Sequence, residues 1–488
     1  IPAPTPDGNH AGMNTRRLTG EAAVYTFGIV LDTLAPFLVL PILGRYLTPG
    51  QFGLADVITA TAGLTYFAVG FNLDQALTRY YYDEEDAHRK RLVTTHLAVV
   101  SVSGTVFLVL GLVGLHAFRG SLQDLSAWHW ALLSVPLMVM SDQAATLFRL
   151  QHQPFKQLGL LSVRAFVWVF FTSFFLVWLR AGISSIFIGR VAGAIFGLGA
   201  SAYALRGLYA LRGNLRFAVR ALRFSLPTLP AAFASWGLVN AARYFLVIGA
   251  SAEETGYYGV GVRLTYIVST IGIGVVMAWG PFFMGIKEEP NAREIQARGL
   301  LYFIAANVVC IAPLLMFARE AVLLLMGSQY LPAVRLVGPM LAATLFSNLS
   351  LFLFVQISVS ERTHWQSVSY AVGLVVMVIA NVLLVPAMKG MGAAIAMLCG
   401  HLATAGTMWF AGQRVYTVPV SVARVSILIL VLTGCLVLAP TTTTWFGTTL
   451  QGIALRALLT VLMWSACLAA VGPGDVLRFA ATMVGKRT

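Results

Sequence analysis

Long, continuous apolar segments separated by short polar turns form the dominant pattern of this 488-residue chain. A helix needs about 20 residues to cross the hydrocarbon of a bilayer, and these segments reach that length. Barrel strands would instead alternate over about ten residues. The pattern therefore predicts an all-α polytopic membrane protein with about fourteen transmembrane helices. The predicted spans are 20–43, 52–78, 92–118, 128–149, 157–179, 183–205, 224–249, 256–284, 298–318, 333–359, 367–386, 391–412, 424–446 and 452–472.

Composition agrees with this class and excludes others. The chain is 58% hydrophobic and only 11% charged, which no soluble globular protein of this size matches. Its four cysteines stand singly in apolar segments, and its eight histidines form no ligand cluster. We find no nucleophile–base pair, phosphate-binding loop or metal motif in the sequence. We therefore expect neither an enzyme nor a protein with a cofactor.

The lysine and arginine residues are distributed unequally between the two predicted sides of the membrane. The net charge is +14. If the N-terminus is cytoplasmic, the even-numbered connections and both termini collect arginine and lysine over the other side by about three to one, which satisfies the positive-inside rule. We therefore predict that both termini face the cytoplasm. Because this sorting accounts for the basic residues, we do not expect nucleic acid as a partner.

The longest basic connection divides the chain. We predict an N-terminal tail, two six-helix lobes joined by a cytoplasmic linker, two further spans and a cytoplasmic tail: 1–19, 20–205, 206–223, 224–412, 424–472 and 473–488. Residues 1–12 are interpreted as a vector remnant or a terminal tail. In the linker, Arg212, Arg216, Arg220 and Arg223 recur at helical spacing. This favours either an amphipathic helix held by anionic lipids or a plain orientation signal, and both interpretations stay open.

Two arginines lie inside apolar segments on either side of a short turn. Arg243 and Arg263 are each about seven residues from that turn, so both should lie roughly 10 Å below the same membrane face. A charge at such depth is costly and is a candidate for function. Asn240 precedes Arg243 by one helical turn. We interpret the pair as a basic cavity for an anion; the alternative is neutralisation by carboxylates on other helices.

A weak internal repeat relates the two predicted lobes to each other. Aligning Gly53 on Gly256 matches two glycine-lined helix faces, each the second helix of a six-helix lobe. Parallel repeats of this kind hold substrate between the lobes.

Other membrane-embedded charges are assigned by depth. Asp142 and Arg164 are expected to form a structural ion pair, as are Asp56 and Arg190. Asp32 has two open interpretations: coupling to a proton or cation, or neutralisation of a cavity arginine.

Three segments carry a resemblance to a known family. They are Leu43 to Ala55, Asn72 to Asp86, and Glu254 to Leu264. The first resembles the outer turn and second-helix start of the polysaccharide-type, Wzx-like flippases of lipid-linked oligosaccharides. The third resembles the matching motif of the second lobe. These flippases belong to the multidrug/oligosaccharidyl-lipid/polysaccharide exporter superfamily, which shares the fourteen-span, two-lobe architecture.

The resemblance implies a task and a site. Such proteins move undecaprenyl-pyrophosphate-linked oligosaccharide, such as an O-antigen unit of lipopolysaccharide, from the cytoplasmic to the periplasmic leaflet of the prokaryotic inner membrane by alternating access. Cavity arginines are expected to hold the pyrophosphate, a role that falls here on Arg243 and Arg263, with Arg45 and Arg79 as secondary candidates. The implied partners are the lipid-linked glycan, membrane lipids, and a glycan polymerase and assembly proteins. A proton or sodium gradient is a possible driving force.

Three rival functions are weighed against this one. A multidrug/cation antiporter of the same superfamily would need a carboxylate-dominated cavity, whereas the embedded charges here are mainly arginines. A sugar-polymerising ligase would carry a large extracytoplasmic loop. A lipid II flippase shares the diphosphate chemistry and is separable by genetic rescue.

Overall fold

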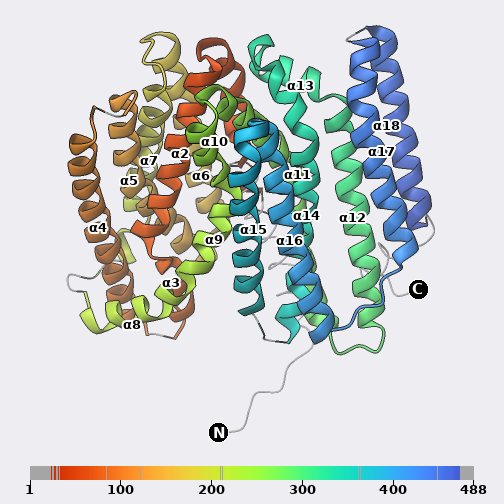
Figure 1. The fold of residues 1–488 in the computed structure, drawn as a ribbon. Coiled ribbons are helices and arrows are strands. Elements are labelled where there is room, and N and C mark those ends of the chain that lie inside the picture. Colours follow the sequence, from red (N-terminus) through yellow and green to blue (C-terminus); the bar gives the residue numbers. More distant parts are fainter. Residues whose placement is uncertain are drawn as a thin grey trace. The chain divides into compact units, whose positions relative to one another are not determined.

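Helices account for nearly all of the secondary structure. The structure, a computed structural model, describes residues 33–472 apart from 84, 121, 209, 211, 212, 361, 363 and 448, together with residues 24, 27, 28 and 31. Over this part of the chain it contains helices α2 to α18 and three short 3-10 turns, with no strand (Figure 1). The predicted all-α class is therefore confirmed.

Twelve of the described helices are long and apolar enough to cross a membrane. Each falls in one of the spans predicted from hydropathy. They are α2 (Pro49–Gly70), α4 (Asp86–Ala117), α5 (Leu125–Leu150), α6 (Pro154–Val177), α7 (Ser184–Ala204), α11 (Ala252–Ile286), α12 (Ala292–Met316), α14 (Val334–Val359), α15 (His364–Met388), α16 (Gly390–Val415), α17 (Val422–Phe446) and α18 (Leu450–Val471).

Two predicted spans have a different form. The seventh is a bent pair, Leu215–Asn240 followed by Ala242–Gly249, with 49° between its two parts. It comprises α8 (Leu215–Ser225), the turn η2 (Leu226–Thr228), α9 (Leu229–Asn240) and α10 (Ala242–Gly249). The first span is described as a shorter apolar helix, Thr33–Tyr46. A helix therefore lies in each of the fourteen predicted ranges.

The chain divides into two compact units. One comprises Ile1–Tyr46 and Ile58–Ala232, and the other Leu47–Val57 and Phe233–Thr488. The boundary at residue 232 lies inside the bent span, beyond the basic linker at which we had divided the lobes. The first two turns of α2 pack with the second unit, while the rest of α2 belongs to the first.

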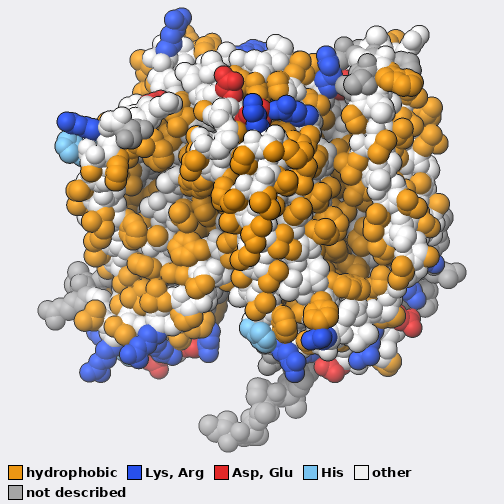
Figure 2. All heavy atoms as spheres, viewed as in Figure 1, with side chains coloured by type: hydrophobic (Ala, Val, Ile, Leu, Met, Phe, Trp, Pro, Cys, Tyr) orange, Lys and Arg blue, Asp and Glu red, His pale blue; other side chains and the backbone are white. Residues whose placement is uncertain are grey.

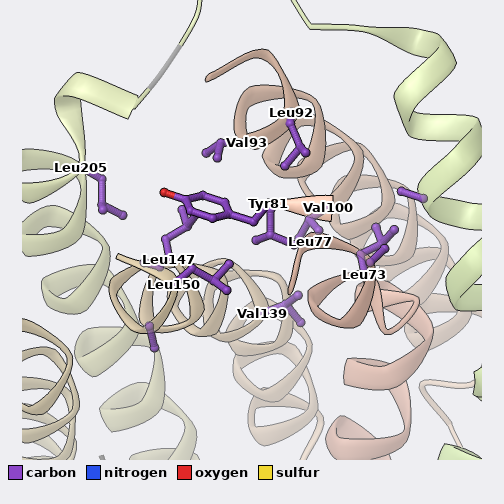
Figure 3. Close-up of a cluster of buried hydrophobic side chains, with 14 of the residues drawn as sticks. Leu73, Leu77, Tyr81, Leu92, Val93, Val100, Val139, Leu147, Leu150 and Leu205 are labelled. Carbon is purple, nitrogen blue, oxygen red and sulfur yellow. The ribbon is translucent and has the colours of Figure 1, made fainter. Parts of the chain in front are cut away.

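The first unit is built around a cluster of aliphatic side chains with Tyr81 among them (Figure 3). Helix α3 (Leu73–Tyr80) supplies Leu73 and Leu77, and α4 and α5 supply most of the others. The predicted span 52–78 breaks before α3, because Phe71 and Asn72 adopt left-handed backbone with φ of 47° and 51°. Asparagine is tolerated there, and its side chain donates to Thr228 Oγ1 at 3.1 Å.

The core of the second unit joins α10, α11, α14, α15 and α16. Tyr258, Met340 and Met377 are fully buried in it beside the small residues Ala393 and Ala394. Small residues let membrane helices approach closely. On the outside, apolar side chains cover the middle of the visible surface of each unit, and charged ones gather at its ends (Figure 2). Such a surface needs a lipid environment, so the protein is a multi-pass membrane protein.

Candidate substrate site

A glycine-to-glycine contact joins the start of α2 to α11 within the second unit. A Cβ atom on Gly53 would overlap the carbonyl oxygen of Ala252, and one on Gly256 would overlap the carbonyl oxygen of Pro49. The two backbones therefore touch, which only glycine allows. This contact carries Asp56, one turn after Gly53, onto the face of α11.

Asp56 is the centre of a cluster of three charges. It is only 3% exposed and accepts hydrogen bonds from two arginines on different elements. Arg243 Nε of α10 lies 2.5 Å from Oδ2, and Arg263 Nη1 of α11 lies 3.0 Å from Oδ1. A Cβ on Gly259 would lie 2.8 Å from Oδ2, so this glycine also makes room for the carboxylate.

Arg243 is held on all sides. It is 3% exposed, and its Nη1 donates to the carbonyl oxygen of Val239 at 2.8 Å and to Asn240 Oδ1 at 3.0 Å. The Asn240 amide nitrogen in turn donates to the carbonyl oxygen of Trp236 at 3.0 Å. In this structure Asn240 therefore orients Arg243. Its binding of substrate stays a prediction.

Arg263 is the more accessible of the two arginines. Its side chain is 18% exposed. Besides Asp56, its Nη1 donates to the carbonyl oxygen of Gly259 at 2.9 Å, and its guanidinium lies 4.4 Å from the ring centre of Phe52. Within the described part of the chain, both of its hydrogen bonds use Nη1. The guanidinium thus retains Nε and Nη2 as donors for a ligand.

The three charges do not cancel. Two guanidiniums face one carboxylate, so the cluster carries a formal charge of +1 among the described residues. A buried excess charge is costly, and a bound anion would offset it. Arginine also suits phosphate because its planar fork donates two parallel hydrogen bonds. The arrangement can therefore bind an anion and disfavours a cation.

Of the two interpretations of the arginine pair, neutralisation by a carboxylate holds in part, because the one carboxylate of Asp56 is shared between both arginines. The interpretation as an anion-binding cavity stays a prediction. The predicted Asp56–Arg190 pair is wrong in its partner, because the glycine contact turns Asp56 towards α11. Arg190 instead lies in the first unit, 5.5 Å from the Phe187 ring centre, and lines a cavity of about 360 Å³.

The other predicted ion pair is present. Arg164 Nη1 of α6 pairs with Asp142 Oδ1 of α5 inside the first unit. The Tyr66 hydroxyl donates to Asp142 Oδ2 at 2.8 Å. Both carboxylate oxygens are therefore engaged, as we expected of a structural pair.

Two further predicted site residues, Arg45 and Arg79, belong to the first unit and are exposed. Arg79 is 57% exposed and pairs with Asp83 at 2.8 Å, one turn along the chain. Asp32 lies outside the described residues. Their proposed roles in substrate binding and ion coupling stay predictions.

One buried arginine was missed as a structural element. Arg456 of α18 is 0% exposed; its Nη2 lies 2.8 Å from Glu320 Oε1 and donates to the carbonyl oxygen of Gly447 at 2.9 Å. The available signal was its position inside the predicted span 452–472, after the first four residues of that span. Because this pair is one to one, it carries no excess charge.

Comparison with known proteins gives a family. A family model described as "Polysaccharide biosynthesis protein" matches residues 18–287, more than half of the 488-residue chain. Among curated proteins, none matches this sequence.

Solved structures share the fold at low sequence identity. The lipid II flippase MurJ in an inward closed conformation aligns with a TM-score of 0.73 at 9% identity, over 94% of this chain and 98% of that one. A mutant of the MATE transporter VcmN from Vibrio cholerae aligns at 0.58 and 16% identity, over 82% and 96%. A MOP superfamily transporter from Pyrococcus furiosus, for which a reversed polarity of the binding pocket has been described, aligns at 0.57 and 13%, over 82% and 95%.

Proposed function

Because the chain belongs to the polysaccharide biosynthesis protein family, we propose that it is a flippase for a polyprenyl-diphosphate-linked oligosaccharide. The coarser assignment, a membrane transporter or flippase with the fold of the MOP superfamily, is the premise. The proposal adds the substrate, an undecaprenyl-pyrophosphate-linked glycan, and its direction, from the cytoplasmic to the periplasmic leaflet of the prokaryotic inner membrane. Its expected partners are membrane lipids and the proteins that build and polymerise the glycan.

The observation that supports this most is the sharing of Asp56 by two arginines. The diphosphate needs a positive site in a region where charge is expensive. Arg263, with Nε and Nη2 unused within the described structure, offers two donors to a phosphate oxygen pair. Arg243 keeps Asp56 in place while Arg263 exchanges one anion for another.

This exchange defines a cycle of charges. Without substrate, Asp56 accepts from both guanidiniums. With substrate, the diphosphate takes over Arg263, while Asp56 remains paired with Arg243. Arg263 faces an anion in both states, Asp56 without substrate and the diphosphate with it, which keeps the energetic difference between the two states small. A small difference is what a carrier needs in order to release its cargo.

A cation antiporter is the less favoured reading because of the sign of the cluster. A cationic drug would meet a formal charge of +1 rather than a carboxylate. The lipid II flippase shares the diphosphate, so only the glycan distinguishes it. Two experiments distinguish a lipid II flippase: flipping of a series of polyprenyl-diphosphate sugars in liposomes, and rescue of peptidoglycan synthesis in cells.

The experiment is flipping by purified protein in liposomes loaded with defined polyprenyl-diphosphate sugars. Arg263→Ala should lower the rate at least tenfold with normal insertion and monodispersity. The matched control is Arg298→Ala, which removes an exposed arginine paired with Glu294 one turn away. Normal flipping by the Arg263 variant, or an equal loss in the control, would remove the proposed site. Repeating the assay without a proton or sodium gradient tests one of the two open interpretations of Asp32, its coupling to a proton or cation.

A further inference from the structure

Helix α8 presents three different faces along its eleven residues. Residues Phe217, Ala218, Ala221 and Ser225 form its buried face. This face packs within the first unit on α3 and α4. Six of its eleven residues are exposed, and they divide into an apolar and a basic face.

One exposed face is apolar. Leu215, Val219 and Leu226 follow one another at spacings of four and seven, which places them on one helical stripe. Their exposed fractions are 81%, 46% and 45%. A surface helix in water would carry polar residues there.

The other exposed face is basic. Arg216, Arg220 and Arg223 follow at spacings of four and three, about a quarter turn from the apolar stripe. All three are exposed, and α8 contains no acidic residue. The Arg220 guanidinium lies 4.2 Å from the Tyr80 ring centre, so an aromatic residue of α3 holds it. The nearby Arg79 and Asp83 form their own pair. Figure 2 shows lysine and arginine gathered over the end of the molecule where Figure 1 places α8.

The neighbouring helix α4 fixes the depth of α8. The backbone N–H of Asn214, the N-cap of α8, donates to Thr95 Oγ1 of α4 at 2.7 Å. In α4, Thr95 lies just after the basic run Arg89-Lys90-Arg91 and before the exposed apolar residues Val102 and Val106. Helix α8 is therefore pinned where α4 passes from its basic end into its lipid-facing part.

From these faces and this depth we propose that α8 is a binding surface for anionic phospholipid headgroups. The apolar stripe enters the acyl boundary of the leaflet, and the arginine stripe lies at the level of the phosphates, the arrangement of interfacial amphipathic helices. Arginine stems also reach along apolar surface towards the headgroups. The chain continues from α8 through η2 into α9, which ends at Asn240, the residue that orients Arg243. Anionic lipid thereby anchors the segment that leads into the candidate substrate site.

The binding test uses the full-length protein and does not depend on transport. The protein is placed in nanodiscs of phosphatidylcholine with increasing phosphatidylglycerol, and retained phosphatidylglycerol is counted by native mass spectrometry. Each basic residue near an anionic surface changes binding about fivefold. The triple variant R216Q/R220Q/R223Q should therefore bind phosphatidylglycerol up to about 100-fold more weakly. The variant R216K/R220K/R223K, which keeps the three charges, should bind it nearly as the wild type does. Leu215→Ser with Val219→Ser should also weaken binding, since it removes the apolar stripe.

The matched control changes three exposed arginines of the second unit, R362Q/R414Q/R424Q, and so removes the same charge. It should retain phosphatidylglycerol at the wild-type level. Equal retention by the α8 triple, or an equal loss in the control, overturns the proposal. Two other results would also overturn the proposal. One is that lipid binding at α8 requires the polyprenyl-diphosphate lipid and not phosphatidylglycerol; the other is that a protein partner covers α8 instead of lipid. Both variants must elute as monodisperse protein.

A second arm rests on the proposed function. Flipping should accelerate with the phosphatidylglycerol fraction in wild type and not in the α8 triple. If the lipid-binding arm succeeds while no flipping occurs in any variant, the proposed function fails and the lipid surface stands. If flipping proceeds but is insensitive to phosphatidylglycerol, the anchoring role fails.

Discussion

Replacing Asp56 with asparagine separates stability from binding in the charge cluster. The substitution keeps the shape of the side chain but removes the charge that faces Arg243 at 2.5 Å and Arg263 at 3.0 Å. Arg243, at 3% exposure, is then left buried without its counter-charge. Removing one partner of a buried pair costs about 3–5 kcal/mol. We expect the lower end of this range, because the Arg263 side chain is 18% exposed and water relieves part of its loss.

Binding should move in the opposite direction. If the diphosphate and Asp56 compete for Arg263, the asparagine variant has lost the competitor. A hydrogen bond to a charged group contributes about 1.5–3 kcal/mol, so the affinity for a polyprenyl diphosphate should rise about 10- to 100-fold. Flipping should nevertheless slow, because the anion no longer has a carboxylate to displace it.

Two assays read these effects. Stability is followed by the temperature at which detergent-solubilised protein loses its monodisperse peak, and affinity by titration with a short-chain polyprenyl diphosphate. The control is Asp142→Asn, which breaks the Arg164 pair of the first unit and should lower stability without changing the affinity. Unchanged or weaker diphosphate binding by a well-folded Asp56→Asn protein would refute the competition between the two anions.

Three further predictions follow from the same contacts. Arg243→Lys should lower both stability and flipping, because lysine cannot replace the guanidinium that reaches Asp56, Val239 and Asn240 together; wild-type behaviour would contradict this. Gly256→Ala should lower the free energy of unfolding by about 1–3 kcal/mol and slow flipping, because the new methyl group meets the Pro49 carbonyl. Gly285→Ala on the same helix has open space and should change neither stability nor flipping. Equal effects of the two substitutions would count against the close contact. Arg456→Leu should be less harmful to thermal stability than Glu320→Gln, because the latter leaves a buried guanidinium without its carboxylate; the reverse order would show that the arginine itself is needed.

Hydropathy by itself determined the class and the spans. Fourteen apolar segments were predicted, and the described residues place a helix in each. The reason is that lipid offers the backbone no hydrogen bonds, so a long apolar segment has only the helix available. The two interruptions depended on local backbone. Phe71 and Asn72 form a left-handed break that an average of hydropathy over the segment does not detect, and the bend before Ala242 lies in an equally apolar stretch.

Depth along a helix is also readable from sequence, and it selected Arg243 and Arg263. It likewise selected Asp142 and Arg164, which lie at similar depth and do pair. Spacing in the 206–223 linker indicated an amphipathic helix, and α8 has that form from Leu215 to Ser225.

Which helices touch, and therefore which charges meet, was decided only by the tertiary structure. Depth alone matched Asp56 with Arg190, but the contact of Gly53 with Gly256 turns Asp56 towards Arg243 and Arg263. Both glycines had been recognised in the sequence as members of corresponding stripes. A stripe shows that a face can approach another helix closely, but it does not say which one. That choice belongs to the packing of the whole unit, because the energy of a buried charge depends on its neighbours and not on its own position in the chain.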